Sequence, residues 1–183
     1  MQKHFNKKEK EKMKSLVIAN NARIMIGPRF RNFSGRRTQW DPIDDGRTVF
    51  NRTFCVELHE TPDYSYGNEE LRIQDLIDDG WNVYRMDPKD EGGEPLYMLR
   101  VKVTFGQYPP IIKMTTPSGE VDLTEETISE LDRSEILNAR MVIRPYEYKR
   151  GKIAAYLKTL YLAVSDKKFG GAILEDFDGY EFE

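Results

Sequence analysis

Cysteine and histidine are nearly absent from this chain, which has one cysteine, Cys55, and two histidines, His4 and His59. A single cysteine excludes an internal disulfide framework and a cysteine-based zinc site, and two histidines leave little for a histidine-ligated metal centre. No apolar run approaches the ~20 residues that span a bilayer. No Walker-type phosphate loop is present, because Gly92-Gly93 and Gly170-Gly171 lack the Lys-Ser/Thr that completes it. We therefore expect a protein of a reducing compartment that needs no metal or cofactor and no membrane.

Aromatic residues and charge, by contrast, are abundant. The 183 residues include 9 Phe, 10 Tyr and 2 Trp, which are too many for a disordered chain, and the length fits one domain. Charge is segregated: residues 1–14 carry six Lys and two Glu, whereas residues 170–183 carry five acids and no base. Without those five acids the net charge of −3 becomes +2. This pattern predicts a basic N-terminal extension (1–15), a polyanion-binding body (16–169) and a flexible acidic tail (170–183).

The hydrophobic pattern predicts a mainly β domain. Alternating apolar residues indicate five main strands, at 16–26, 48–58, 96–105, 140–149 and 152–164. A partial capping box from Thr124 to Thr127 predicts a small helix over 124–132. A change of phase near Thr159 predicts a β-bulge in the last strand. Residues 28–46 show no periodicity and predict a long loop.

Five strands with a helix between the third and the fourth is the element order of an OB-fold, a five-stranded Greek-key barrel. Residues 60–95 would then be an insertion after the second strand, with a helix over 68–79 and a short strand over 81–86. Another short strand, at 111–115, would extend the third strand or pair with it. A β-sandwich built from the same strands is the alternative fold.

Basic and aromatic residues are interleaved at positions where strand periodicity or loop assignment predicts exposure. A single strand of nucleic acid needs this combination, because cations follow its phosphates and aromatic rings stack on its bases whatever the sequence. The predicted DNA-binding residues lie in the loop after the first strand, on the third strand and along the last hairpin: Arg29, Phe30, Arg31, Phe33, Arg36, Arg37, Trp40, Arg100, Lys102, Arg144, Tyr146, Tyr148, Lys149, Arg150, Lys152, Tyr156 and Lys158. The alternative is that the rings pack in the core and the cations are ordinary surface charge.

The acidic tail contains three aromatic residues, which solubility alone does not require. An acidic segment of this kind is a ligand for a basic, apolar groove. We expect it either to dock partner proteins or to fold back onto the basic site of its own chain. The residues predicted to do so are Glu175, Asp176, Phe177, Asp178, Tyr180, Glu181 and Phe182.

Indications of catalysis are weaker. Asp44-Asp45 and Asp78-Asp79 could hold a catalytic metal ion, but each pair precedes a glycine and fits a turn or a helix end. Cys55 in mid-strand and His59 at a strand end could form a nucleophile and its base. We expect a non-enzymatic protein, with a metal-dependent nuclease built on the aspartate pairs as the weakest alternative.

Residues 141–148 and 155–161, together with the tail from Glu175 to Glu183, resemble the single-stranded-DNA-binding proteins of tailed phages. That family has a single OB-fold body and an acidic C-terminal tail with an aromatic residue at or near its end. The resemblance implies a protein that binds single-stranded DNA without sequence specificity and protects it during replication or recombination. It also implies tail-mediated docking of replication or recombination proteins and a cytoplasmic location in an infected or bacterial cell. The sequence is also compatible with a homo-oligomer. An RNA-binding or regulatory β-barrel module is the alternative function.

Overall fold

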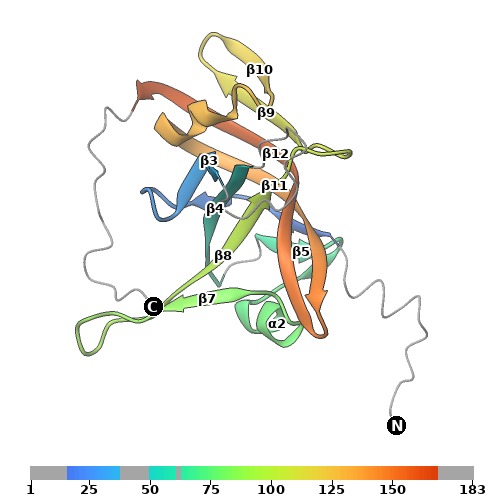
Figure 1. Ribbon diagram of the computed structural model, residues 1–183. Coiled ribbons are helices and arrows are strands. Elements are labelled where there is room, and N and C mark those ends of the chain that lie inside the picture. The colour runs from blue at the N-terminus through green and yellow to red at the C-terminus, as the bar shows by residue number, and fades with distance from the viewer. Residues whose placement is uncertain (1–15, 38–49, 61–62, 169–183) are drawn as a thin grey trace.

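The computed structural model describes residues 16–37, 50–60 and 63–168, and these form a mainly β structure, as the hydrophobic pattern predicts (Figure 1). All described strands belong to one mixed sheet. In chain order they are β1 (Val17–Ala19), β2 (Arg23–Ile24), β3 (Arg31–Arg37), β4 (Phe50–Leu58), β5 (Tyr64–Tyr66), β6 (Glu69–Glu70), β7 (Val83–Met86), β8 (Leu96–Val103), β9 (Ile111–Thr116), β10 (Gly119–Leu123), β11 (Ser134–Lys149) and β12 (Lys152–Lys168). The helices are α2 (Ile73–Asp78) and the 3₁₀-helix η1 (Ile128–Arg133).

Four strands form the centre of the sheet, in the order β4-β8-β12-β11. The β4–β8 and β11–β12 pairs are antiparallel, whereas β8 and β12 are parallel. Strand β9 pairs with the same edge of β12 as β8 does, but further along that strand. On the outer edges, β1 pairs with β11 and β2 pairs with β4. The short segment 17–24 therefore links the β11 edge of the centre to the β4 edge.

The inward side chains of these strands form the main core. The predicted inward residues Leu99, Val101, Met141 and Ile143 are all at most 1% exposed. The rings of Phe33 and Phe54 stack there with their centroids 5.0 Å apart, an arrangement typical of buried aromatic pairs. Since successive side chains of a strand point to opposite faces of the sheet, the outward-facing residues of the same strands are free of the core and can contact a ligand.

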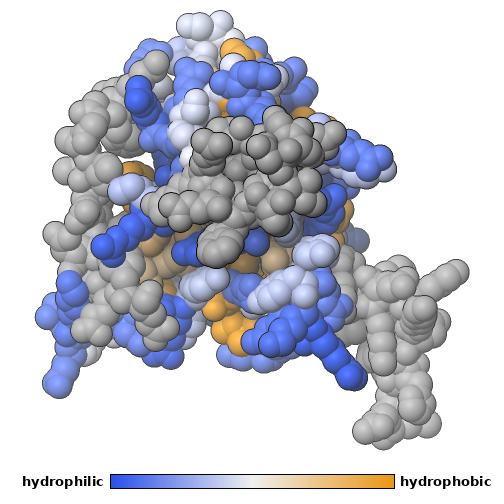
Figure 2. Space-filling view, in the orientation of Figure 1, coloured by the Kyte–Doolittle hydropathy of each residue, from blue (hydrophilic) through white to orange (hydrophobic). Residues whose placement is uncertain are grey.

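A second, smaller cluster lies away from the main core. It consists of Met25, Phe30, Cys55, Met86 and Met98. Met98 is on the face of its strand that alternation predicts to be exposed, yet it is 3% exposed because it packs within this cluster. On the side of the molecule seen in Figure 2, the surface of the described residues is mostly hydrophilic.

The β-bulge predicted in the last strand is confirmed. The β11–β12 register shifts between the pairs Val142–Thr159 and Ile143–Leu157, which leaves Lys158 as the extra residue. Leu157 and Leu160 can both face the core because the extra residue changes the phase of the strand.

Other sequence-based expectations about the elements are wrong. Residues 31–37 form β3, paired with β4, where the sequence predicts a loop, because pairing with a neighbour stabilises a segment that has no periodicity of its own. The expected strand 16–26 is interrupted, since Asn21 has a left-handed φ of 48° that separates β1 from β2. The expected helix over 124–132 is a 3₁₀-helix over Ile128–Arg133, and the one over 68–79 is confined to Ile73–Asp78. The sequence pattern does not predict strands β5, β6 and β10, all of which are short.

A buried arginine anchors β3 to η1. Arg31 is 6% exposed, and its Nη1 donates to the backbone oxygens of Leu131, at 3.2 Å, and Ser134, at 2.8 Å. Burial lowers the pKa of the Arg31 guanidinium to about 10, with the neighbouring Asp132 carboxylate opposing that shift. The group therefore stays charged at neutral pH and acts as a structural donor at the end of the 3₁₀-helix.

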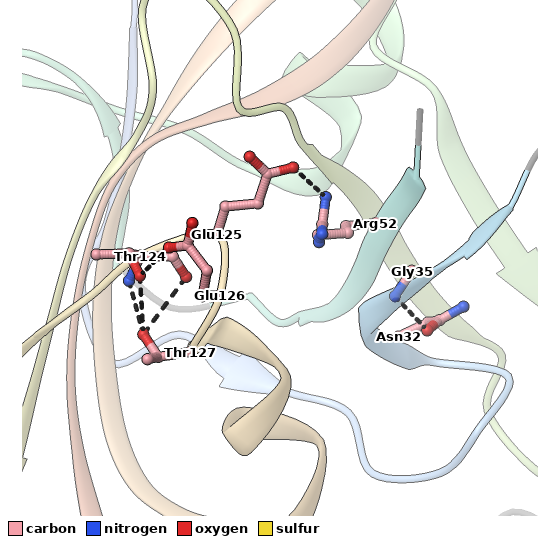
Figure 3. A network of polar contacts seen from close by, with 7 residues as sticks. All are labelled: Asn32, Gly35, Arg52, Thr124, Glu125, Glu126 and Thr127. Carbon is pink, nitrogen blue, oxygen red and sulfur yellow. Dashed lines mark hydrogen bonds and ion pairs between the residues drawn. The ribbon is translucent and has the colours of Figure 1, made fainter. Parts of the chain in front are cut away.

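The segment before η1 is held by polar contacts to β4. Arg52 of β4 lies 3.5 Å from the Glu125 carboxylate (Figure 3). Beside it, the Thr124 backbone N–H donates to Thr127 Oγ1 at 2.8 Å. The N-cap of η1 is Thr127 rather than Thr124, so the predicted capping box is wrong and this contact belongs to the turn before the helix. The turn over 124–127 is thus fixed both locally and by a strand far away in the sequence.

The insertion between β4 and β8 contacts the hairpin formed by β11 and β12. Gly80 accepts a hydrogen bond from Ile153 N–H at 2.8 Å, and Asn82 N–H donates to Ile153 O at 2.9 Å. Gly80 has a left-handed φ of 96°, and a Cβ at this position would overlap the carbonyl oxygen of Gly151. The close approach of two backbones at this point therefore requires glycine.

Replacing Gly80 by Ala should destabilise the protein by roughly 2–4 kcal/mol, because the change adds a left-handed φ penalty of roughly 1–2 kcal/mol to a steric clash with the hairpin. Gly92→Ala is the matched control, since Gly92 also has a left-handed φ, of 89°, but a Cβ there would have nothing within 4 Å. Urea unfolding of both variants measures the difference. Equal destabilisation would contradict the close approach of Gly80 to Gly151.

Candidate nucleic-acid interface

The side of the central strands that faces away from the main core carries basic and aromatic residues. We call this set the outer face; it consists of Arg100, Lys102, Arg144, Tyr146, Tyr156 and Lys158, all of which the sequence predicts as DNA-binding. Register makes Lys102 of β8, Tyr156 of β12 and Arg144 of β11 direct neighbours across three strands. Adjacent strands lie about 4.8 Å apart, so two cations flank one ring within a span of about 10 Å.

The two tyrosines of the outer face contact each other edge to face. The Tyr146 and Tyr156 ring centroids are 5.6 Å apart with the planes at 70°. Tyr146 is 56% exposed and Tyr156 is half-buried, so each ring still presents surface to solvent. Lys102 Nζ lies 5.8 Å from the centroid of the Tyr156 ring, within the range of a cation–π contact. Flat apolar surface and positive charge are therefore combined in one place.

The outward positions of β11 and β12 carry basic and no acidic side chains over this face. The outward positions of β11 from Arg140 to Tyr146, and those of β12 from Ala154 to Tyr161, include no acidic residue. Arg144 and Lys158 are both exposed. A phosphodiester chain that crosses these strands would meet cations without intervening carboxylates, which is the condition for strong, salt-dependent binding.

Tyr84 extends the outer face, and the sequence analysis missed it. It lies on β7 opposite Met98 and is 43% exposed. The guanidinium carbon of Arg100 is 5.0 Å from the centroid of the Tyr84 ring. Nothing local indicates this pairing, because it depends on β7 lying beside β8.

The tip of the β11–β12 hairpin continues the basic surface. Tyr148, Lys149, Arg150 and Lys152 are exposed there, around the predicted turn at Arg150-Gly151. The Tyr148 hydroxyl donates to Asn82 Oδ1 at 3.0 Å, so the insertion also orients a hairpin side chain. Within the tip, Glu147 Oε1 accepts the Gly151 N–H at 3.0 Å and is thereby engaged in the turn.

The loop after the first strand does not present its predicted set of residues to solvent. Phe30, Arg31 and Phe33 are at most 7% exposed, so the expectation that they are exposed is wrong. Their burial follows from the pairing of β3 with β4, which places Phe33 against Phe54 and turns Arg31 toward η1. Arg29 is exposed. Arg36 and Arg37 lie in β3, and nothing is described of their side chains; Trp40 and the predicted tail residues 175–182 lie outside the described residues.

The residues of the nuclease hypothesis have local structural partners. Asp79 accepts a hydrogen bond from the Tyr66 hydroxyl at 2.9 Å, and Asp78 accepts one from Gln74 at 2.8 Å. Asp44 and Asp45 lie outside the described residues. Among the residues that are described, no group of three or more His, Cys, Asp or Glu is placed to hold a metal ion.

Cys55 and His59 likewise have separate surroundings. Burial raises the pKa of the Cys55 thiol, and its neighbour Arg100 partly offsets this. His59 Nε2 is 2.9 Å from Asp63 Oδ2, and its ring contacts Tyr64 edge to face. A buried thiol with a raised pKa is a packing residue rather than an activated nucleophile.

Comparison with known proteins was made at three levels. A family model described as "Putative phage ssDNA-binding domain" matches residues 5–170, which include the four central strands, the insertion and the hairpin. A search of curated proteins and a search of solved structures each found no match. Within the described ranges, no helix is long and apolar enough to cross a membrane.

The burial of Cys55 predicts slow chemistry at its thiol. At pH 8 the native protein should react with an aromatic disulfide reagent at least tenfold more slowly than the urea-unfolded chain, since burial both excludes the reagent and disfavours the thiolate. Absorbance of the released thiolate measures both rates. Reaction of the native protein at the unfolded rate would show that Cys55 is accessible and would restore it as a candidate nucleophile.

Proposed function

Because this chain belongs to the phage single-stranded-DNA-binding family, we propose that its outer face binds single-stranded DNA without sequence preference. The observation that carries the proposal is the row formed by Lys102, Tyr156 and Arg144, in which a ring lies between two cations on adjacent strands. Stacking on such a ring contributes about 1–3 kcal/mol per base and accepts any base. Double-stranded DNA should bind poorly, because its bases are already stacked on one another.

The sheet topology supports an OB-type barrel as the framework of this site. A parallel pair, β8–β12, lies between antiparallel neighbours, and residues 17–24 link the β11 edge to the β4 edge. In an OB-fold, oligonucleotides bind across the second and third strands and the loop between the fourth and fifth. In this chain the corresponding elements are β4, β8 and the tip of the β11–β12 hairpin, which adjoin the outer face.

In this proposal the body (16–169) covers and protects single-stranded DNA during replication or recombination of a phage genome in the infected cell. The basic extension (1–15) adds positive charge. Residues 60–95 form an insertion that hydrogen-bonds to the β11–β12 hairpin and supports it. The acidic tail (170–183) docks replication or recombination proteins through Phe177, Tyr180 and Phe182. The tail also competes with DNA for the outer face, since it has the charge of a nucleic acid and aromatic groups that imitate its bases.

Removing the rings of the outer face should weaken binding without unfolding the protein. Tyr156→Ala and Tyr146→Ala should each reduce affinity for single-stranded DNA by about 1–3 kcal/mol, measured by fluorescence anisotropy with labelled oligo(dT). Tyr108→Ala is the matched control, because Tyr108 is 75% exposed but lies in the connection between β8 and β9. Log K should also fall linearly with log salt, at about −0.7 per phosphate contact.

Three results would count against this function. Salt-independent affinity would remove the electrostatic part, and cleavage of DNA in Mg²⁺ would restore the nuclease hypothesis. Preferential competition by RNA of the same sequence would favour the RNA-binding alternative, since a site for RNA must engage the 2′-hydroxyl.

Deleting residues 170–183 should tighten DNA binding at low salt. The deletion removes five negative charges, and a short tether can give the tail an effective millimolar concentration at the basic face. The gain should shrink at physiological salt, where the Debye length is about 8 Å. Titrations of both forms at the two salt concentrations measure the effect; unchanged or weaker binding after deletion would exclude competition by the tail.

A further inference from the structure

The sheet side that carries the outer face continues beyond it, along the distal half of β12. Strand β8 flanks β12 at Ala155 and Tyr156, and β9 flanks it from Thr159 to Ala163. Strand β9 pairs with β12 beyond the point where β8 ends. The distal half of β12 therefore also has a neighbouring strand along each of its two edges. The outer face described above uses only the first part of this surface.

A second row on this surface repeats the composition of the first. Register aligns Arg140 of β11, Tyr161 of β12 and Lys113 of β9 as direct neighbours. Tyr161 is 42% exposed, and Lys113 is half-buried. The first row has the same order across the sheet, with Arg144 on β11, Tyr156 on β12 and Lys102 on β8.

The cations of the second row have weak or neutral local partners. Arg140 Nε donates to Asn20 Oδ1 at 3.0 Å, which leaves the charge of the guanidinium uncompensated by that contact. Lys113 Nζ is 3.7 Å from Glu120 Oε1, with the two side chains 39% and 59% exposed. Asp122 of β10 is the direct cross-strand neighbour of Lys113, so two carboxylates border this cation. An ion pair this exposed contributes little, so a phosphate can compete with the carboxylate for the ammonium group.

Between the rows lie apolar residues, one threonine and one lysine. Val142 and Thr159 are half-buried, and Ile111 is 56% exposed. Lys158, the bulged residue, lies on the same strand between Tyr156 and Tyr161. The path from one row to the other therefore offers contact to bases and a cation for the backbone, with no carboxylate among these residues.

We propose that Tyr161, with Arg140 and Lys113, forms a second stacking site for the same DNA strand that crosses the outer face. This inference rests on the proposed function. Because Lys158 is bulged, the distance between the rows is measured on β11, where four residue steps separate Arg140 from Arg144. At about 3.3 Å per residue these correspond to roughly 13 Å, or about four stacked nucleotides at about 3.4 Å each. The second row lengthens the binding site, and it therefore contributes only to oligonucleotides long enough to reach both rings.

The test compares oligonucleotides of two lengths. Tyr161→Ala should weaken binding of oligo(dT) of about 20 nucleotides roughly tenfold, and should change binding of oligo(dT) of about 4 nucleotides by less than twofold, because the short ligand occupies the outer face. Tyr156→Ala should weaken binding of both lengths. Tyr161→Phe keeps the ring and should restore wild-type affinity, whereas Tyr161→Leu keeps bulk without a π-face and should behave like Tyr161→Ala. Lys113→Gln should lessen the salt slope for the long ligand by about 0.7.

The outcomes separate the two proposals. If Tyr161→Ala and Tyr161→Leu, folded by circular dichroism, bind the long oligonucleotide as tightly as the wild type, the second site is excluded and the outer face stands. If Tyr161→Ala fails to fold, the comparison of Tyr161→Leu with Tyr161→Phe decides. If the wild-type chain itself does not bind single-stranded DNA of either length, the proposed function fails and the second site fails with it.

Discussion

The pairing of β12 along both of its edges is the interaction on which the rest of the structure depends. Strand β11 pairs along one edge, and β8 and then β9 pair along the other. Since strand side chains alternate, this one strand supplies Leu157 and Leu160 to the main core and Tyr156 and Tyr161 to the opposite side. The apolar burial that stabilises the inner side thereby fixes the positions of the groups on the outer side.

A site built on paired strands differs from one built on loops in what binding costs. Register spaces the rings and cations of the outer face before any ligand arrives, so binding of DNA at the proposed site would require little backbone ordering. The insertion adds to this, because Gly80 and Asn82 hydrogen-bond to Ile153 and Asn82 also accepts from Tyr148. The long hairpin is therefore supported close to its exposed tip.

Positive charge in this chain serves two purposes that composition cannot separate. Arg31 and Arg52 are 6% and 8% exposed and hold β3, β4 and the segment around η1 together. Burying a guanidinium is tolerable only where acceptors compensate for lost water, and the backbone oxygens of Leu131 and Ser134 do so for Arg31. Among the described residues, exposed cations such as Arg144 and Lys158 remain available to a ligand on the central strands.

Local sequence determined the mainly β character, the faces of the central strands, the hairpin turn and the bulge in β12. Each of these follows from alternation or turn chemistry within one segment, which is why Lys102, Tyr146 and Tyr156 could be predicted as outward-facing. Tertiary structure decided which segments cover others. Burial of Phe30 and Phe33 needs β3 to pair with β4, and the place of Tyr84 needs β7 beside β8. Such pairings join residues far apart in the chain, and their stability comes from contacts that no single segment contains.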